Sequence, residues 1–135
     1  MAIEIRETKE ISKRAILELY QSVNWSSARK PDKLYQALLH SHTLLSAWDG
    51  DRLIGLGNAL SDGFLVAYYA HLVVHPAYQG QGVGRMIVEC FKERYGDFHQ
   101  QVLVADGGSI DFYQKCGFER AGETQSMWIY QGNEH

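Results

Sequence analysis

Three glycines at alternate positions lie between a long apolar stretch and a helical pattern. The apolar stretch covers residues 64–75, Gly80, Gly82 and Gly84 follow it, and the helix is expected over residues 82–95. Glycine lets peptide N–H groups approach a bound group closely. The free N–H groups and the positive dipole of a helix N-terminus point to the same place. The spacing therefore predicts an anion site, most often for phosphate, and a glycine-rich turn without a ligand is the alternative.

Two common nucleotide sites do not fit this loop. A P-loop requires Lys followed by Ser or Thr after its last glycine, and Val83 and Arg85 flank Gly84 here. A dinucleotide fingerprint requires Gly-x-Gly-x-x-Gly at the first strand–helix turn, followed by an acidic residue at the end of the next strand. In this chain the glycines are two apart and come after several strands.

The elements that must position the loop follow from the pattern of apolar residues. Strands are expected at 3–6, 43–48, 52–60, 64–75, 101–105, 118–121 and 126–130, and helices at 12–23, from Pro31 onward, at 82–95 and at 110–115. The order β-α-α-β-β-β-α-β-α-β-β predicts an α/β fold with a mixed, mostly antiparallel sheet of six to seven strands and helices on both faces. We expect one domain over residues 1–135.

Three details of these elements are informative. Gly55 and Gly57 weaken the second strand of the 43–60 hairpin and predict close approach by another group. The continuous apolar run at 101–105 predicts a strand buried on both faces. Gly117 is expected to end the last helix.

Composition excludes several classes of partner. The net charge of −3 gives no basic excess to neutralise nucleic-acid phosphates. We expect no membrane segment, because no apolar run approaches the ~18–20 residues that a span needs. The N-terminus lacks the apolar core of a signal peptide. Cys90 and Cys116 do not form a short disulfide framework, so we expect reduced thiols in a cytoplasmic protein.

Two segments then resemble one family. Residues 72–84 look like the acetyl-CoA signature of the GNAT N-acetyltransferases, Gln/Arg-x-x-Gly-x-Gly/Ala after an apolar strand. Residues 106–118 resemble that family's Asn-x-x-Ala-x-x-Phe-Tyr-x-Lys-x-Gly-Phe segment. With the matching order of elements, the resemblance covers nearly the whole chain. It implies a GNAT fold in which two strands splay apart to admit the cofactor, acetyl-CoA.

The resemblance also implies cofactor-binding residues. The backbone of Leu72, Val73 and Val74 would pair with the pantetheine arm, and the amides of Gln79, Gly80, Gln81, Gly82, Val83, Gly84 and Arg85 would hold the pyrophosphate. Asp106, Ser109, Phe112 and Tyr113 would complete the cofactor site. Asp106 replaces a common Asn, and a turn-forming role is an equal interpretation. Ser109 replaces a common Ala, and helix capping is its alternative role.

Acetyl transfer to an amine needs a base for the amine and a proton for the departing thiolate. Tyr113 matches the family's proton-donating tyrosine, and its alternative role is packing beside Phe112. Cys90 and Cys116 have no paired histidine, so we expect no thiol nucleophile. The six histidines lack metal-ligand spacing, so we expect no metal.

The general base departs from the family's pattern. Members often place a Glu on the strand expected at 64–75, which contains no acid. Tyr68 is near that position. His71 would face the other side of the sheet unless a β-bulge, common in this strand of the family, switches faces. Its imidazole is the better base, with an ordinary pKa near 6.5. A structural histidine or a water relay without a single base are the alternatives.

The acceptor is expected opposite the pyrophosphate. Candidate contacts by position are Trp25, Tyr35, Asp62, Tyr68, Tyr69 and Trp128, which would suit an amine through aromatic faces and one acid. A weaker resemblance to plastid GNATs that acetylate arylalkylamines and protein amines supports an amine acceptor.

The expected partners are thus a small-molecule or protein amine, with a second copy in a homodimer also open. The expected reaction is direct attack of the amine on the thioester in a ternary complex. The alternatives are an acetyl-CoA sensor or partner subunit without efficient turnover, and an acetyltransferase of protein lysines or N-termini.

Overall fold

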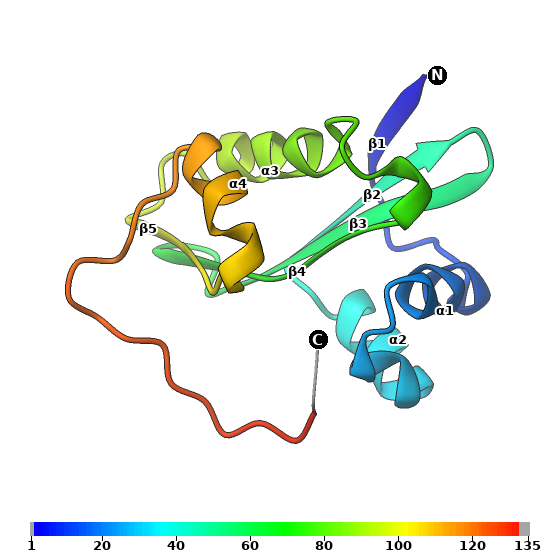
Figure 1. Ribbon diagram of the computed structural model, residues 1–135, viewed down its shortest axis with the longest axis horizontal. Helices are drawn as coiled ribbons and strands as arrows, with labels where there is room; N and C mark the ends of the chain where they lie inside the picture. The colour runs from blue at the N-terminus through cyan, green and yellow to red at the C-terminus, as the bar shows by residue number, and fades with distance from the viewer. Residues whose placement is uncertain (1, 133–135) are drawn as a thin grey trace.

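A computed structural model describes residues 2–132 (Figure 1). In that part of the chain one sheet contains five strands in the order β1-β2-β3-β4-β5. The strands are β1 (Ile3–Glu7), β2 (Thr43–Asp49), β3 (Arg52–Ser61), β4 (Val66–Val74) and β5 (Gln100–Leu103). Neighbouring strands are antiparallel except β4 and β5, which are parallel. The helices are α1 (Lys13–Ser22), α2 (Pro31–Leu39), α3 (Val83–Arg94) and α4 (Ile110–Lys115), with short 3-10 turns η1 (Ser26–Arg29), η2 (Pro76–Tyr78) and η3 (Gly107–Ser109).

Helices cover both faces of the sheet, as the sequence predicts. In Figure 1, α3 lies on one face and α1 and α2 lie on the other. Each face has its own apolar cluster, one built around Ile87 and Phe91 of α3 and the other around Ile16 and Leu19 of α1. The two faces together give a three-layer α/β fold.

Local sequence signals explain where the helices on the α1 face begin and end. The Ser12 side chain accepts a hydrogen bond from Ala15 N and caps α1. Pro31 occupies the first turn of α2, where its missing N–H is not needed. Asn24 adopts a left-handed backbone with φ of 57°, which ends the α1 segment and turns the chain into η1.

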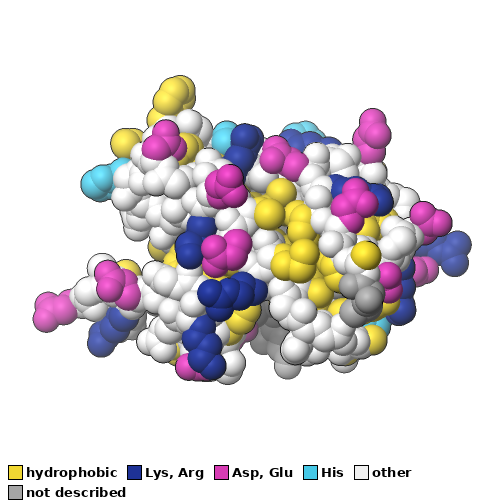
Figure 2. Space-filling model, turned by 90° about the horizontal axis from the view of Figure 1, so that it is seen from above, with side chains coloured by type: hydrophobic (Ala, Val, Ile, Leu, Met, Phe, Trp, Pro, Cys, Tyr) yellow, Lys and Arg dark blue, Asp and Glu magenta, His cyan; other side chains and the backbone are white. Residues whose placement is uncertain are grey.

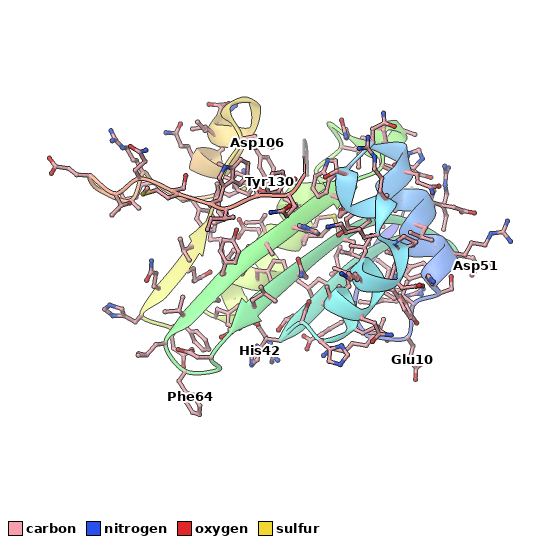
Figure 3. All side chains as sticks on the ribbon, turned by 90° about the horizontal axis from the view of Figure 1, so that it is seen from below. Glu10, His42, Asp51, Phe64, Asp106 and Tyr130 are labelled. Atoms are coloured by element: carbon pink, nitrogen blue, oxygen red, sulfur yellow. The ribbon has the colours of Figure 1, made fainter. Side chains whose placement is uncertain are left out.

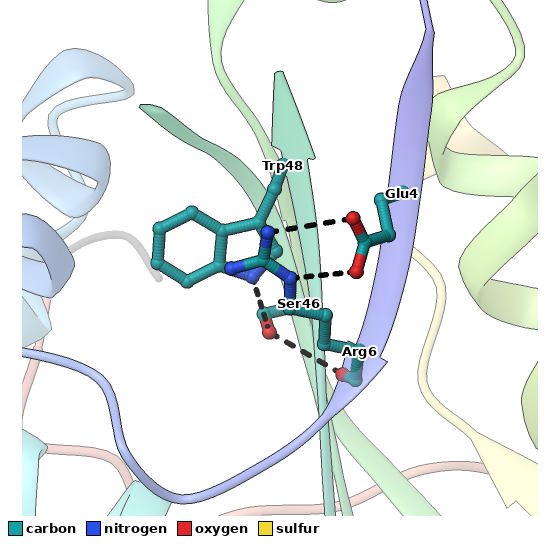
Figure 4. A network of polar contacts seen from close by, with 4 residues as sticks. All are labelled: Glu4, Arg6, Ser46 and Trp48. Carbon is teal, nitrogen blue, oxygen red and sulfur yellow. Dashed lines mark hydrogen bonds and ion pairs between the residues drawn. The ribbon is translucent and has the colours of Figure 1, made fainter. Parts of the chain in front are cut away.

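A small polar network joins β1 to β2 (Figure 4). The Arg6 guanidinium donates to Glu4 at 2.9 Å and lies 4.7 Å above the Trp48 ring. Trp48 Nε1 donates to Ser46 Oγ, which donates to the Arg6 carbonyl. The charged side chains are exposed, so the network fixes the pairing of the edge strand more than it contributes stability.

Charges of both signs are distributed over the surface. Figure 2 shows lysines and arginines interspersed with acidic side chains on the face seen from above. No helix among residues 2–132 is both long and apolar enough to cross a membrane. Cys90 and Cys116 are free thiols.

Two predictions about the sheet are wrong. Residues 118–121 and 126–130 belong to no strand in the described structure, which lowers the strand number from six or seven to five. A strand needs a backbone partner, and apolar alternation cannot supply one. β5 is not buried on both faces: Gln100 is exposed and the other three residues are half-buried. It is also an edge strand, because in the described sheet it pairs only with β4.

The predicted close approach at Gly55 and Gly57 is confirmed. A Cβ at Gly57 would lie 2.8 Å from Phe91 Cε2 and 2.9 Å from Ile87 Cγ2. Both contacts belong to α3, so these glycines let α3 pack closely on β3. This spacing fixes the depth at which the N-terminus of α3 meets the sheet.

We predict that Gly57→Ala destabilises the fold by about 1–3 kcal/mol, because the added methyl overpacks the α3 interface. Gly107→Ala is the matched control, since no atom lies within 4 Å of its added Cβ, and it should stay within about 0.5 kcal/mol of the parent. Urea denaturation of both variants measures the difference. Equal stabilities would contradict the packing role of Gly57.

Candidate active site

β4 and β5 separate partway along their length. Their parallel pairing covers Val66 to Tyr69 on β4 and ends at the pair Tyr69–Leu103. β4 continues five residues further, to Val74, paired only with β3. The segment that contains Leu72, Val73 and Val74 therefore has a backbone edge that β5 does not cover. This is the splayed geometry that the sequence resemblance implies.

The glycine loop lies directly after this segment. Gly80 and Gly82 have φ of 78° and 85°, a conformation that side chains other than glycine rarely adopt. Gly82 is the N-cap residue of α3, and the first helical bond runs from Met86 N to its carbonyl. The first-turn amides of Val83, Gly84 and Arg85 thus have no acceptor within the helix, and this turn holds no acidic residue.

Side chains of the loop hold its backbone in place. Gln79 Nε2 donates to the Val74 carbonyl at 3.0 Å, and Gln81 Nε2 donates to the Ala77 carbonyl at 3.2 Å. Tyr78 is buried, and its hydroxyl donates to Asp49 at 2.6 Å. Asp49 raises the pKa of Tyr78 by accepting this bond. The two glutamines therefore shape the loop with their side chains and leave its amides for a ligand.

Gly84 has a different reason to be glycine. Its backbone is helical, but an added Cβ would lie 3.3 Å from Phe112 Cζ. Phe112 belongs to α4, so this contact seats α4 against the N-terminal turn of α3. The packing role was not visible from the sequence.

A cavity of about 140 Å³ opens where β4 and β5 separate. It brings together residues from four parts of the chain: Trp25 before η1, residues 69–72 of β4, Val88 and Phe91 of α3, and the stretch from the end of β5 to α4. The predicted site residues among its lining are Trp25, Tyr69, His71, Leu72, Asp106, Ser109 and Tyr113. The sequence motifs at 72–84 and 106–118 therefore meet at one place.

Tyr113 lies on α4 and lines this cavity. Its ring packs edge-on against Phe112 and Phe118, with centroids 5.0 and 6.0 Å away. Burial raises the pKa of Tyr113 to about 12, and the neighbouring Cys116 and Asp106 add to the shift. The phenol therefore stays protonated at neutral pH and can donate a proton.

A β-bulge in β4 determines which way His71 points. Asn58 of β3 pairs with His71, but the next β3 residue, Ala59, pairs with Tyr69, so Ala70 is the extra residue. Before the bulge Tyr69 packs in the α3 cluster, and after it Val73 packs in the α1 cluster. The face switch that would bring His71 to the α1 side is confirmed.

Buried Asn58 stabilises this bulge. Its Oδ1 accepts the His71 N–H at 2.9 Å, and its Nδ2 donates to Ser41 Oγ at 3.0 Å. The Ser41 hydroxyl in turn donates to the Ala37 carbonyl. The side chain thus replaces the ladder bond that the extra residue disrupts.

The His71 ring is held by two aromatic residues of the α1 region. Tyr20 Oη lies 2.8 Å from His71 Nδ1, and the Trp25 ring meets the imidazole edge-on at 5.4 Å. Burial raises the pKa of Tyr20 well above its ordinary value, so this hydroxyl stays protonated. The orientation of the imidazole is therefore fixed from its Nδ1 side.

Three predicted residues, Tyr68, Tyr69 and Trp128, have other surroundings than expected. Tyr68 lies where β4 pairs with both β3 and β5, and it is not among the residues that line the cavity. Tyr69 lines the cavity but is a core residue, stacked on Phe91 with its hydroxyl donating to Gln101 Oε1. Trp128 lies in the C-terminal segment, stacked on Tyr130.

Asp62 is not among the residues that line the cavity. It lies in the β3–β4 turn beside Phe64, and Figure 3 shows Phe64 well apart from Asp106. Its Oδ1 accepts hydrogen bonds from three backbone amides, those of Phe64, Leu65 and Val66. These bonds hold the pKa of the Asp62 carboxyl below its ordinary value. Its role in the structure is to close the turn.

The two ends of α4 have different local structures. Ser109 stands at the N-cap of α4, but its hydroxyl donates to the Asp106 carbonyl and makes no cap bond, so the capping interpretation is wrong. Gly117 ends α4 as predicted, with φ of 99°.

Among residues 2–132, no group of three or more His, Cys, Asp or Glu side chains is placed to hold a metal ion.

Sequence reasoning missed Tyr20 and Asn58. Asn58 had a usable signal, because a single amide in an otherwise apolar strand has to find buried partners. Tyr20 had none, since it occupies an ordinary apolar position of an amphipathic helix and contacts His71 only through the fold.

Comparison with known proteins agrees with this geometry. Residues 12–118 match the model of the acetyltransferase (GNAT) family. The chain belongs to the GNAT acetyltransferase family. The match includes the glycine loop and the segment that ends at Phe118, so both motifs lie inside it.

Relatives include plastid members, as the weaker resemblance predicts. The uncharacterized N-acetyltransferase ycf52-like of Prochlorococcus marinus is 33% identical over 120 residues, covering 82% of this chain and 66% of that protein. The GCN5-related N-acetyltransferase 2, chloroplastic, of Arabidopsis thaliana is 40% identical over 82 residues, covering 58% and 32%. The chain thus spans two thirds or less of the length of these two relatives.

Solved structures share the fold over nearly the whole chain. A GNAT family acetyltransferase of Streptococcus pneumoniae has a TM-score of 0.83 at 30% identity, covering 96% of this chain and 99% of that one. The enzyme AAC(6')-Iy, solved with a bisubstrate analogue of coenzyme A, has a TM-score of 0.72 at 17% identity, covering 97% and 98%. At that identity the second similarity shows the fold alone.

We predict that Asp62→Ala lowers the free energy of unfolding at neutral pH without changing the acceptor KM. The folded carboxyl has a lowered pKa, so its contribution is present above the ordinary value of 3.8 and is lost as pH falls through the folded pKa. The stability gap to the parent should therefore shrink from about pH 7 to about pH 3. Asp62→Asn, which keeps an Oδ1 acceptor, is the control. A raised KM with unchanged stability would return Asp62 to the acceptor site.

Proposed function

We propose that this protein is an acetyl-CoA-dependent N-acetyltransferase that moves an acetyl group to a primary amine. One observation supports this most directly. A single cavity joins the β4 edge beyond its pairing with β5 to Tyr113, a half-buried and protonated phenol. An anion site at the N-terminus of α3 lies at the end of the same strand.

The donor fits the polar groups along this strand. The uncovered edge of Leu72, Val73 and Val74 suits the amide groups of a pantetheine arm, which bind as an added strand does. The amides from Gly80 to Arg85 suit the pyrophosphate, because glycine φ values open the loop and the helix dipole favours negative charge. Arg85 is exposed in the same turn and adds a positive charge.

Tyr113 and His71 divide the proton transfers. Tyr113 donates a proton to the sulfur as the thiolate departs. His71 removes a proton from the attacking amine, directly or through one water. Base catalysis requires the tautomer in which His71 Nδ1–H donates to Tyr20 Oη, which leaves the Nε2 lone pair to accept. Tyr20 then acts as a positioning residue.

The acceptor amine is proposed to approach from the Trp25 side. Trp25 and His71 lie edge to face at one wall of the cavity, and Asp106 is the carboxylate in its lining. An aromatic face with one carboxylate favours a cationic amine before it loses its proton. This composition supports a small amine over a large acidic acceptor.

Two measurements test the assignment of Tyr113. Acetyl-CoA at a hundredfold excess over its dissociation constant should stabilise the parent by about 2.7 kcal/mol, and Tyr113→Phe should keep that stabilisation. The same variant should lower kcat by about 10²–10⁴-fold, the usual contribution of a general acid. Since the pKa of Tyr113 is about 12, the parent should show no alkaline loss of kcat from this group below about pH 10. Tyr95→Phe is the control, because the Tyr95 hydroxyl contacts His42 and Thr43 and Tyr95 does not line the cavity.

Each other outcome has a defined meaning. If acetyl-CoA does not raise the melting temperature, the central proposal is wrong. If it binds but no amine in a broad panel is acetylated, the sensor or partner-subunit alternative is favoured. An unchanged kcat in Tyr113→Phe would remove Tyr113 as the acid.

We predict that His71→Ala lowers kcat by about 10²-fold or more and removes the acidic limb of the kcat–pH profile. The KM for acetyl-CoA should stay within a few-fold, because the donor contacts are backbone contacts. Added imidazole should restore part of kcat, and Tyr20→Phe should cause a smaller loss with the limb retained. A His71→Ala enzyme with the parental pH profile would favour a water relay instead.

A further inference from the structure

Tyr113 lies on a helix that has little of its own to hold it in place. α4 contains six residues, and none of them is buried. A helix this short is marginal in water unless its neighbours pack against it. The position of the Tyr113 hydroxyl therefore depends on the contacts that attach α4 to the rest of the molecule.

Two contacts attach α4 to α3. The first is the packing of Phe112 against Gly84, at the N-terminal turn of α3. The second lies at the other end of α4, where the Lys92 ammonium donates a hydrogen bond to the Cys116 carbonyl at 2.6 Å. Cys116 is the C-cap residue of α4. Carbonyls at a helix C-terminus lack partners within the helix and carry the negative end of its dipole, so an ammonium is their complementary partner.

The surroundings of Lys92 fit this contact. The Lys92 side chain is 35% exposed, and its ammonium lies 3.4 Å from Glu89 Oε1, one turn earlier on α3. An added Cβ at Gly117 would lie 3.3 Å from Lys92 Nζ, so the missing side chain leaves space for the ammonium. Cys116 is buried. Water therefore competes less for this hydrogen bond than for an ion pair at the surface.

Lys92 is outside the cavity in which the reaction is proposed. Tyr113 lines the cavity of about 140 Å³, and Lys92 is not among its lining residues. An effect of Lys92 on the reaction is therefore expected to pass through α4. Gly84 and Lys92 are about 12 Å apart along α3, so the two contacts together fix the tilt of α4. Tyr113 lies between Phe112 and Cys116 in the sequence, and a change of tilt would move its hydroxyl.

We propose that Lys92 is a positioning residue for Tyr113, because its ammonium holds the C-terminal end of α4 and thereby sets where the Tyr113 hydroxyl lies. This role rests on the proposed function, in which Tyr113 protonates the departing sulfur. Proton transfer requires the donor oxygen within hydrogen-bond reach of the sulfur, and a displacement of about 1 Å can cost about 10²-fold in rate. Lys92 thus supports the reaction without touching the cofactor.

A double-mutant cycle tests this role. Lys92→Met keeps an apolar side chain and removes the ammonium, and it should lower kcat by about tenfold or more in the parent. In the Tyr113→Phe background the same substitution should lower kcat by less than about twofold, since no phenol remains to be positioned. Both backgrounds should retain the stabilisation by acetyl-CoA, because the proposed donor contacts lie on β4 and the glycine loop.

Lys13→Met is the matched control. Lys13 pairs with Asp32 between α1 and α2, and its side chain is 41% exposed. The substitution therefore removes a comparable lysine contact away from α4, and kcat should stay at its parental value. An equal loss of kcat from Lys92→Met with and without the Tyr113 hydroxyl would overturn the proposal, since a general loosening of the fold gives that result.

Amide hydrogen exchange tests the attachment of α4 without any turnover. The amides of Cys116, Gly117 and Phe118 donate to carbonyls of residues 112–114. In Lys92→Met these three amides should exchange faster by about tenfold or more, because a hydrogen bond to a charged group is lost. Amides of β3 should keep their parental rates. If the parent acetylates no amine, the proposed function is wrong, and the exchange rates still decide whether Lys92 fixes α4. Unchanged exchange at these three amides would overturn the proposal.

Discussion

The bulge in β4 opposite Asn58 is the constraint on which the site depends. Side chains in a regular strand alternate between faces, so a strand cannot place neighbouring functions on one side without an interruption. Ala70 is that interruption, and Asn58 makes it stable by accepting the His71 N–H. Upstream of the bulge, Tyr69 packs under α3. Downstream, His71 faces Tyr20 and Trp25 on the other side.

The same strand also changes partners close to the bulge. Its pairing with β5 ends at Tyr69, one residue before Ala70. The bend of a bulge and the loss of a neighbour therefore coincide, which opens the cavity between the strands. The backbone of β4 and the His71 side chain therefore line the same cavity. The glycines of β3 complement this arrangement, since they let α3 approach closely and direct its N-terminus to the end of β4.

How far the sequence predicts this structure depends on the range of the interaction. Helix limits near Ser12 and Pro31 and the turn at Gly117 follow from local chemistry, and the structure confirms them. The glycine loop is equally predictable from local sequence. Its anion-binding geometry depends only on the φ values of its own glycines and on the first amides of α3. The role of Asp62 in the β3–β4 turn was not predicted, because its three backbone donors become apparent only in the folded structure. The contact between Tyr20 and His71 spans 51 positions, and no local signal marks it.

The last two expected strands show the limit most clearly. Their residues have the composition of strands, and the prediction of that tendency is sound for an isolated segment. A strand is completed by its neighbour, however, and local composition does not specify that neighbour. In the described structure β5 is the last strand of the sheet, and the cavity of about 690 Å³ beside it is lined on one side by residues 117–122, which form no strand. Ile129 remains exposed. A strand-like composition is therefore not enough to form a strand, because the pairing that would bury such residues depends on the rest of the fold.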